Sequence, residues 1–568
     1  MPGKNGLRTF AFHRDESATS PAMAMALGAA PGGAVAGVAP GEDLGSMEPE
    51  RAALLLLKNA LGSASLPGFT APEVDGGGAE FKSLGHRKLF LTNSQTVKFR
   101  ELYRKIPIYG SLITVEMDTR NRLLSINSSL GEPAGVDPVA KVSPADALAT
   151  IRKAAGHGEE ALDAQPVLHY YFDDAGTWRL VYIVEDVPHR EAPPAAPDDL
   201  GGPGDHLLPE VFDYVVDAHS GELVATLPRT QTAGAQAAPP AVLDDEAPDG
   251  LAVPRRFRCS DVPGTGRVLA DPGANVLTYD FAFRSLDAER GGLPGAAVVR
   301  KEPDPWDPAA VSAHANAAEV ADFLQRVLMR RGLDDAGGAF ISTINCVRIP
   351  GGKEWRNAAW IGTQMVYGQR QVEGKLRSYA VARDVVAHEM FHGVTERTAR
   401  LDYVGESGAL NESYSDVFGI LIANSHQPDV AQWDWKIGEE LDGTGLPLRD
   451  VSAPERCGQP AHRKDYQDLP RTAAGDWGGV HKNSGIHNKA AYNLLTAERD
   501  GAPVLDPAAV AKLFYLTLTE QLSRTSVFAD SRRGVELVAR SLFRNDPARD
   551  GKLAAISKAF EDVGIEAG

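Results

Sequence analysis

The pentapeptide His-Glu-x-x-His at 388–392 is the feature that most limits what this chain can become. On a helix, residues four positions apart lie roughly 40° from each other on one face, so His388 and His392 can offer two imidazoles to one metal ion. The stretch is apolar around them, which predicts a helix. Zinc accepts neutral imidazoles and keeps one position open for water in catalytic sites, and Glu389 is placed to hold that water. A surface helix with two solvated histidines is the alternative, which the pentapeptide alone does not exclude.

A catalytic zinc needs a third protein ligand, and Glu412 is the candidate. It lies in the helix-forming stretch 408–416, with Asp416 one turn further along the same face. We assign Glu412 as ligand and Asp416 as the carboxylate that receives the second N–H of a ligating histidine. Without the upstream histidines, this pair would suit a solvated helix face. The arrangement with a third histidine six residues after the second is excluded, because Thr398 occupies that position.

Composition excludes several classes of protein. The chain has 568 residues, enough for two to four domains. Its formal net charge of -18 argues against a nucleic-acid partner, and no apolar run is long enough to span a membrane. The three cysteines, Cys259, Cys346 and Cys457, form no disulfide framework and include no CxxC pair. At most one bridge can form, and the sequence leaves open whether it does.

The chain divides by composition into five parts. Residues 1–47 are rich in Ala, Gly and Pro, which predicts a disordered leader without a clear signal peptide. Residues 48–228 form two small α+β units. The Pro- and Asp-rich segment 229–255 predicts a linker, which also suits proteolytic processing. A strand-rich lobe is expected at 256–400 and a helical lobe at 401–568.

Periodicity places the individual elements. Helices are expected at 51–61, 144–155, 308–331, 410–425, 485–498, 507–522, 530–544 and 551–562. Strands are expected at 88–92, 113–117, 123–127, 167–172, 178–184, 211–216, 223–226, 276–281, 296–300, 340–348 and 359–367.

Four motifs in order resemble the thermolysin family of zinc endopeptidases. They are the active-site region 384–419, the edge strand 357–368, the second active-site motif 478–492 and the C-terminal stretch 559–564. The resemblance covers 256 to the end. It implies an α+β fold with a two-lobed gluzincin catalytic domain, in which the zinc site lies in the cleft between a β-rich and a helical lobe. Residues 97–110 and 214–221 are similar to the thermolysin-type propeptide and the unit that follows it, which implies an α+β propeptide.

The resemblance assigns roles to matching positions. One catalytic Zn2+ would be held by His388, His392 and Glu412, and Glu389 would be the general base for attack of a zinc-bound water on an internal peptide bond. Tyr403 and His481 would stabilise the oxyanion, and Asp476 would be the carboxylate that orients His481. Asn357 and Ala358 would bind the substrate backbone, and Arg449 would bind the carbonyl beyond the scissile bond. Asp416 would support His388, and Asn411 would lie in the outer shell.

Calcium is expected to be weakened in this chain. The family usually carries a double calcium site near the zinc helix, and Asp384, Asp434 and Glu439 are the candidate ligands. Ala423 stands where a carboxylate is expected, and loss of a carboxylate weakens a Ca2+ site that depends on oxygen ligands. We therefore expect one calcium ion or none.

The resemblance predicts a zinc endopeptidase that is made as a zymogen and secreted. Its partners would be protein or peptide substrates, with an apolar residue preferred after the scissile bond, and its own propeptide as an intramolecular inhibitor. A catalytically silent relative that binds zinc or acts as an inhibitor is the alternative.

Overall fold

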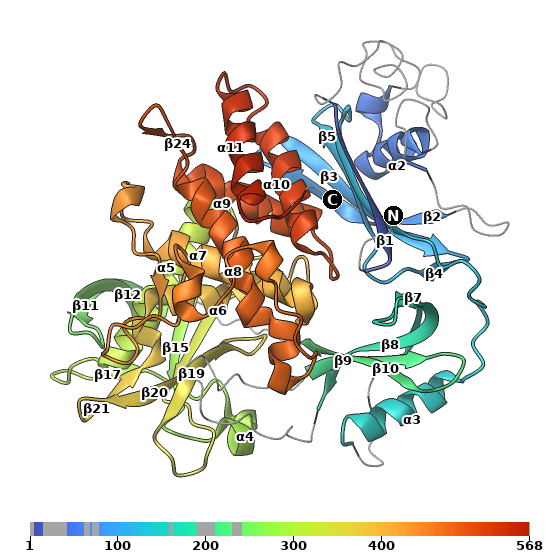
Figure 1. Ribbon diagram of the computed structural model, residues 1–568. Coiled ribbons are helices and arrows are strands. Elements are labelled where there is room, and N and C mark those ends of the chain that lie inside the picture. The colour runs from blue at the N-terminus through green and yellow to red at the C-terminus, as the bar shows by residue number, and fades with distance from the viewer. Residues whose placement is uncertain are drawn as a thin grey trace.

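The computed structural model describes residues 5–14, 43–61, 69–70, 79–157, 162, 164–189, 211–229 and 241–566. Two small N-terminal units lie beside a larger C-terminal part that has a strand-rich and a helical lobe (Figure 1). This confirms the expected α+β class. Among the described residues, no helix has the length and apolar character needed to cross a membrane.

The first unit is an antiparallel sheet covered on one face by α2 (Pro49–Ala60). The strand order is β1-β6-β5-β3-β2, with β4 beside β3. Leu56 and Leu57 of α2 are buried in one cluster with Val97 and Phe99 of the sheet. The strands are β1 (Leu7–His13), β2 (Glu80–Leu89), β3 (Ser94–Tyr103), β4 (Ile106–Pro107), β5 (Leu112–Asp118) and β6 (Leu123–Gly131).

Strand β1 corrects the expectation of a disordered leader over residues 1–47 for its own residues, while 15–42 lie outside the described ranges. It pairs antiparallel with β6 along its whole length, from Leu7 opposite Gly131 to His13 opposite Ser125. Leu7 and His13 are each 1% exposed. The overall Ala, Gly and Pro content of the leader hid this strand, which is stable because the sheet edge supplies both its hydrogen bonds and its burial.

The second unit is a four-stranded antiparallel sheet that buries both faces. Its order is β10-β9-β8-β7, and α3 (Pro144–Ala154) begins at Ser143, whose hydroxyl caps the Asp146 N–H. One face packs in a cluster with α3, and the other packs against Val404 of the C-terminal part. The strands are β7 (Val167–Phe172), β8 (Trp178–Pro188), β9 (Val211–Asp217) and β10 (Leu223–Arg229).

The strand-rich lobe contains two sheets and the long helix α5 (Pro308–Leu328). The first sheet comprises β11 (Ala241–Pro248), β12 (Pro254–Val262), β13 (Gly266–Val268) and β17 (Val299–Arg300). The second comprises β14 (Ala270–Asp271), β15 (Val276–Asp280), β16 (Ala296–Ala297), β18 (Phe340–Ile344), β19 (Trp355–Trp360), β20 (Met365–Val372) and β21 (Lys375–Ser378). The short helix α4 (Leu286–Glu289) lies between β15 and β16 in the sequence. Strand β19 ends the path of this sheet, next to β20.

Strand β11 also corrects the second part of the expected linker at 229–255, whereas 230–240 lie outside the described ranges. All 8 residues of β11 pair with β12 in an antiparallel hairpin. Asp245 holds this hairpin to the lobe, since it accepts hydrogen bonds from the Trp306 indole and from Arg267. Composition alone hid the strand, because its second half, Asp244 to Pro248, is acidic and ends in proline.

The helical lobe is built around two helices that are buried on nearly all sides, α6 (Arg383–Glu396) and α7 (Gly405–Ala423). Around them lie α8 (Asp476–Leu495), α9 (Pro507–Leu516) with a π-helical turn at Thr517–Gln521, α10 (Phe528–Leu542) and α11 (Arg549–Glu561). Two short hairpins, β22 (Lys436–Ile437) with β23 (Arg449–Asp450) and β24 (Glu498–Arg499) with β25 (Ala502–Pro503), complete the lobe.

Candidate active site

Two packed helices bring the metal-ligand candidates together. Phe391 of α6 stacks on Phe418 of α7 with ring centroids 3.7 Å apart. The backbones also approach closely, since a Cβ at Gly419 would lie 3.0 Å from the carbonyl oxygen of Asp384. This contact sets α7 against the helix that carries His388 and His392.

His388, His392 and Glu412 form the one group of three or more metal-ligating side chains, within the described ranges, whose ligand atoms all lie within 4.8 Å of one another. The two Nε2 atoms are 3.1 Å apart. Glu412 places Oε2 3.5 Å from His388 Nε2 and Oε1 3.4 Å from His392 Nε2. Bonds of about 2.0–2.1 Å in a tetrahedral zinc site give edges of about 3.3 Å, so this spacing suits zinc.

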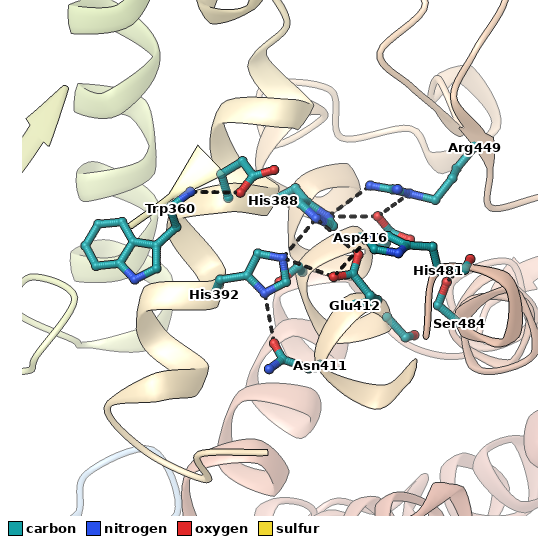
Figure 2. A network of polar contacts seen from close by, with 12 residues as sticks. Trp360, His388, His392, Asn411, Glu412, Asp416, Arg449, His481 and Ser484 are labelled. Atoms are coloured by element: carbon teal, nitrogen blue, oxygen red, sulfur yellow. Dashed lines mark hydrogen bonds and ion pairs between the residues drawn. The ribbon is translucent and has the colours of Figure 1, made fainter. Parts of the chain in front are cut away.

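Hydrogen bonds at the far side of each imidazole leave both Nε2 atoms without a proton. The Nδ1 atom of His388 lies 2.8 Å from Asp416 Oδ1, and that of His392 lies 2.8 Å from Asn411 Oδ1 (Figure 2). Both acceptors require a proton on Nδ1, and in the neutral form that binds a metal Nε2 then carries the lone pair. The buried Oε2 of Glu412 accepts no hydrogen bond. Three lone pairs thus face one another, which is the arrangement a bound cation would satisfy.

Arg449 supports the same carboxylate. Its Nε donates to Asp416 Oδ1 at 2.8 Å, and its Nη2 lies 3.4 Å from His388 Nδ1 (Figure 2). Burial by itself would raise the pKa of Asp416, but the Arg449 guanidinium and the His388 N–H hold the pKa below its ordinary value. Asp416 therefore stays an ionised acceptor for His388.

Tyr403 and His481 lie on the other side of Glu412. The Tyr403 hydroxyl donates to Glu412 Oε1 and lies 3.0 Å from His481 Nε2. Asp476 accepts from His481 twice, with Oδ1 2.5 Å from Nδ1 and Oδ2 2.9 Å from the backbone N–H. Burial acts to lower the pKa of His481, but the carboxylates of Glu412 and Asp476 raise it above its ordinary value. Both groups can donate hydrogen bonds at one edge of the ligand cluster.

Strained backbone positions the Asp476 and His481 pair. Asp476 and Trp477 have φ of 53° and 49°, and Gly478 and Gly479 follow at 93° and 77°. Positive φ is uncommon for Asp and a genuine outlier for Trp. The regular turns of α8 begin only after Gly479, which is still earlier than the helix start expected at 485. Asp476, which accepts from His481, lies at the beginning of the non-helical run.

Glu389 faces the sheet of the other lobe. Its Oε2 accepts the backbone N–H of Trp360, the last residue of β19, at 3.1 Å. Its side chain is neither fully buried nor tied to the ligand carboxylate by any hydrogen bond among the described contacts. The carboxylate therefore lies between edge strand β19 and the ligand cluster.

The substrate-binding candidates on β19 are not free in this structure. Asn357 and Ala358 are 6% and 4% exposed, and the Ala358 N–H donates to Asn357 Oδ1 at 2.9 Å. The pairing of β19 with β20 shifts between Trp355 and Ala358, so Asn357 lies in an irregular part of the ladder. A substrate would have to replace this internal hydrogen bond.

The candidate calcium ligands do not form a comparable cluster. Asp384, Asp434 and Glu439 all belong to the described residues but not to any group of ligand atoms within 4.8 Å. Burial and neighbouring carboxylates raise the pKa of Asp384 to about 7 and that of Glu439 to about 7. Near Ala423, the Arg383 guanidinium donates to the Ala423 carbonyl at 3.3 Å, which brings a fixed positive charge to that position.

The sequence analysis missed two contacts at the site. Ser415 Oγ lies 3.1 Å from His392 Nδ1, beside Asn411, and the four-residue spacing of Asn411 and Ser415 could have indicated a shared helix face. The backbone N–H of Trp360 on Glu389 had no such signal, because it depends on how the two lobes pack.

The N-terminal units reach the segments beside Tyr403 and His481. Arg229 of β10 and Tyr109 both bond Asp402, the residue before Tyr403, at 2.6 and 2.9 Å. Phe212 of β9 packs against Trp477, the residue after Asp476, with ring centroids 6.2 Å apart. Residues beside both hydrogen-bond donors are thus in contact with the N-terminal half.

The structure thus brings a His-Glu-x-x-His helix together with a third candidate metal ligand, Glu412. The model of the thermolysin metallopeptidase catalytic domain matches residues 261–396, and that of its alpha-helical domain matches 399–565. The chain belongs to the thermolysin family of metallopeptidases.

The relatives extend the match toward the N-terminus. The chain is 31% identical over 474 residues to bacillolysin of Bacillus amyloliquefaciens, which covers 81% of each protein. It is 36% identical over 304 residues to the neutral protease NprE of Bacillus pumilus, which covers 53% of this chain and 91% of that protein. Among solved structures, the precursor of protealysin from Serratia proteamaculans aligns with a TM-score of 0.44 and 32% identity, over 54% of this chain and 91% of that one.

Proposed function

We propose that the chain is the zymogen of an endopeptidase that uses one zinc ion, held by His388, His392 and Glu412. The observation that carries this is the set of three lone pairs, two on Nε2 atoms and one on Glu412 Oε2, that face one another without a proton between them. The chemistry that zinc supplies when bound is Lewis-acid polarisation of a carbonyl and of a water molecule.

The protein's own groups supply the rest of the reaction. Glu389 takes a proton from the attacking water at its carboxylate and passes that proton to the leaving amine. Tyr403 and His481 donate hydrogen bonds to the scissile carbonyl oxygen as its negative charge develops. Asp476 keeps His481 oriented through two hydrogen bonds, and Asp416 and Asn411 do so for the two ligating imidazoles.

Substrate contacts are the part of this proposal that depends most on the family. Edge strand β19 would receive the substrate backbone at Asn357 and Ala358 once their mutual hydrogen bond opens. Arg449 would bind the carbonyl beyond the scissile bond while it holds Asp416. The substrate class is peptides and proteins with an apolar side chain after the scissile bond. Cleavage of matched peptides with Leu or Asp at that position tests this, and an Asp preference would refute it.

The N-terminal half is proposed to be the inhibitory propeptide, and to include β1. Contacts of Arg229 and Tyr109 with Asp402, and of Phe212 with Trp477, support this because they hold the segments beside Tyr403 and His481. We infer that processing occurs between 229 and 241. Arg229 is buried in its ion pairs, and β11 is paired along its length, so a cut on either side would require opening that structure.

Export and calcium complete the proposal. We infer secretion from the family, and peptidase activity in the culture medium would support it. A calcium site at Asp384, Asp434 and Glu439 would be weak, since Arg383 already brings a positive charge beside Ala423. Titration with Ca2+ should therefore raise the thermal midpoint only at millimolar concentrations, and micromolar binding would refute this.

The experiment that tests the activity compares two glutamates of α6. Wild type should bind one zinc and cleave peptides. Glu389→Gln should bind zinc and not cleave peptides. Glu396→Gln, the same change at the last residue of α6, should bind zinc and cleave peptides. N-terminal sequencing of the mature form should begin between 230 and 241. Equal cleavage by wild type and Glu389→Gln would refute the catalytic role, and zinc binding without cleavage in wild type would favour a silent, zinc-binding relative.

A further inference from the structure

A chain of buried hydrogen bonds runs from Asp416 away from the metal-ligand candidates. Asn488 Nδ2 donates to Asp416 Oδ2 at 2.8 Å, and Asn488 Oδ1 lies 2.6 Å from Ser413 Oγ. Ser413 Oγ lies 2.7 Å from His487 Nδ1, and His487 Nε2 lies 2.9 Å from Ser531 Oγ. This series of hydrogen bonds ends at Tyr414, whose hydroxyl is 2.8 Å from Ser531 Oγ. It connects α7, α8 and α10.

Every proton in this chain has one possible place. The Asp416 carboxylate can only accept, so the Asn488 amide nitrogen faces it and the amide oxygen faces Ser413. Two oxygens 2.6 Å apart need a proton between them, and only Ser413 has one to give. Since that proton is used, Ser413 must accept from His487 Nδ1–H.

The same logic fixes the far end. Burial lowers the pKa of His487 to about 3, so its ring is neutral and Nε2 carries a lone pair when Nδ1 carries the proton. Ser531 must then donate to Nε2, and Tyr414 must donate to Ser531. All the donors therefore point toward Asp416. Dipoles aligned in this way strengthen one another and stabilise a negative charge at the end of the chain.

The surroundings make this alignment consequential. Asp416, Ser413, Tyr414, His487, Asn488 and Ser531 are each 0% exposed. The His487 ring is enclosed by aromatic rings, with centroids between 5.4 and 5.9 Å away at Tyr414, Phe514, Phe528 and Phe560. In such a low-dielectric environment a polar group without a partner costs free energy, and the hydrogen bonds of an aligned series are electrostatically stronger than in water.

We propose that His487, through Ser413 and Asn488, is a positioning residue for zinc binding that acts on His388 by way of Asp416. Asp416 Oδ1 holds the His388 N–H, and the aligned chain fixes Oδ2 of the same carboxylate. The carboxylate is thereby held in place, which orients the His388 ring with Nε2 toward the other ligand candidates. The inference rests on the proposed zinc site.

The test measures zinc affinity rather than activity. The full chain carrying Glu389→Gln, which prevents self-cleavage, is compared with and without His487→Leu by competition against a chromophoric chelator. Loss of an outer-shell contact commonly weakens metal binding about 10–100-fold, and we expect a loss at the lower end of that range. His487→Asn should recover part of the affinity, because its amide N–H can replace Nδ1–H toward Ser413.

A matched control is provided by His314 of α5. It is also 0% exposed and bonded at both nitrogens, with Nδ1 2.9 Å from Thr278 Oγ1 and Nε2 2.8 Å from the Arg258 carbonyl. His314→Leu should lower the thermal midpoint of the zinc-free chain much as His487→Leu does, yet leave zinc affinity unchanged.

The outcomes separate this inference from the proposed function. If the parent chain binds no zinc, the proposed function fails. If the parent binds zinc and His487→Leu binds it equally, or if His314→Leu loses as much affinity, the positioning role is overturned. Ser413→Ala removes one hydroxyl from the same chain and leaves little space behind. It keeps the test decisive should His487→Leu fail to fold, since parent-like zinc affinity in Ser413→Ala would also overturn the proposal.

Discussion

Replacement of Arg229 by methionine should detach the N-terminal half from the peptidase part far more than loss of an exposed arginine at the same interface. The Arg229 side chain is 6% exposed and lies between Asp213, 0% exposed, and Asp402, 7% exposed. Its nitrogens bond these carboxylates at 2.7 and 2.6 Å and the Tyr109 hydroxyl at 3.0 Å. Arg229→Met keeps the bulk of the side chain and removes its charge.

The burial of these groups sets the magnitude. Breaking a buried ion pair by removing one partner costs about 3–5 kcal/mol, because the remaining charge is left without compensation. Here Asp213 keeps Arg524 at 2.8 Å, and Asp402 keeps the Tyr109 hydroxyl, so the lower end of that range applies. A loss of about 3 kcal/mol shifts the docking equilibrium about 10²-fold toward the open form.

Arg471 is the matched control. It pairs across the same interface with Asp174, but the two side chains are 55% and 65% exposed. Exposed pairs contribute about 0–1 kcal/mol, which is at most about fivefold in the docking equilibrium. Hydrogen exchange of the full chain carrying Glu389→Gln measures the opening directly, in peptides from β9, β10 and 402–404. Arg229→Met should lose about 10²-fold in protection there and Arg471→Met little. Equal protection in the two variants would refute the reasoning.

Three further predictions concern the site and its surroundings. Tyr403→Phe should lower kcat about 10²–10³-fold and leave zinc content unchanged, as measured by steady-state kinetics and metal analysis, and wild-type kcat would contradict its role. Dialysis against a chelator should abolish peptide cleavage and added Zn2+ should restore it, whereas His392→Ala should stay inactive with added Zn2+. The pKa of Asp384, Glu439 and Glu440 is raised from 3.8 or 4.5 to about 7, so the folded state holds protons that the unfolded state has lost. Stability should therefore fall as pH rises between about 4 and 7. Glu439→Gln should raise the calcium-free thermal midpoint by about 2–4 °C at pH 8 and by less toward pH 4. A shift of the midpoint that does not depend on pH would contradict this.

Local periodicity was enough to predict the parts of the site that lie on one helix. His388 and His392 share a face because a helix turns about 100° per residue, and the same rule relates Glu412 to Asp416. The distance from α6 to α7 could not be derived in this way. It depends on the Phe391 and Phe418 stack, and nothing in either segment specifies that the two rings meet.

The strands expected at 88–92 and 359–367 were wrong in that each spans a turn, between β2 and β3 and between β19 and β20, and elements with weak local signals were missed. Strand β1 lies in a leader rich in Ala, Gly and Pro and the second half of β11 is acidic, and both are stable because a neighbouring strand supplies hydrogen bonds and burial. The start of α8 was placed too late because Trp477 and the residues around it adopt positive φ, which only tertiary contacts can enforce. The inward chain from Asp416 to His487 was equally out of reach, since its members come from three helices.

The close approach at Gly419 has a consequence for how tolerance to substitution should be read in this protein. A Cβ at that position would lie 3.0 Å from the Asp384 carbonyl oxygen, which is tighter than most such contacts, so a side chain there would require the backbones of α6 and α7 to give by a few tenths of an ångström. In a survey of all single substitutions, Gly419 should therefore tolerate fewer residues than an ordinary helix position, although it has no side chain. The effect of substitutions at Gly419 would then report the close approach of the α6 and α7 backbones rather than the loss of a side-chain function.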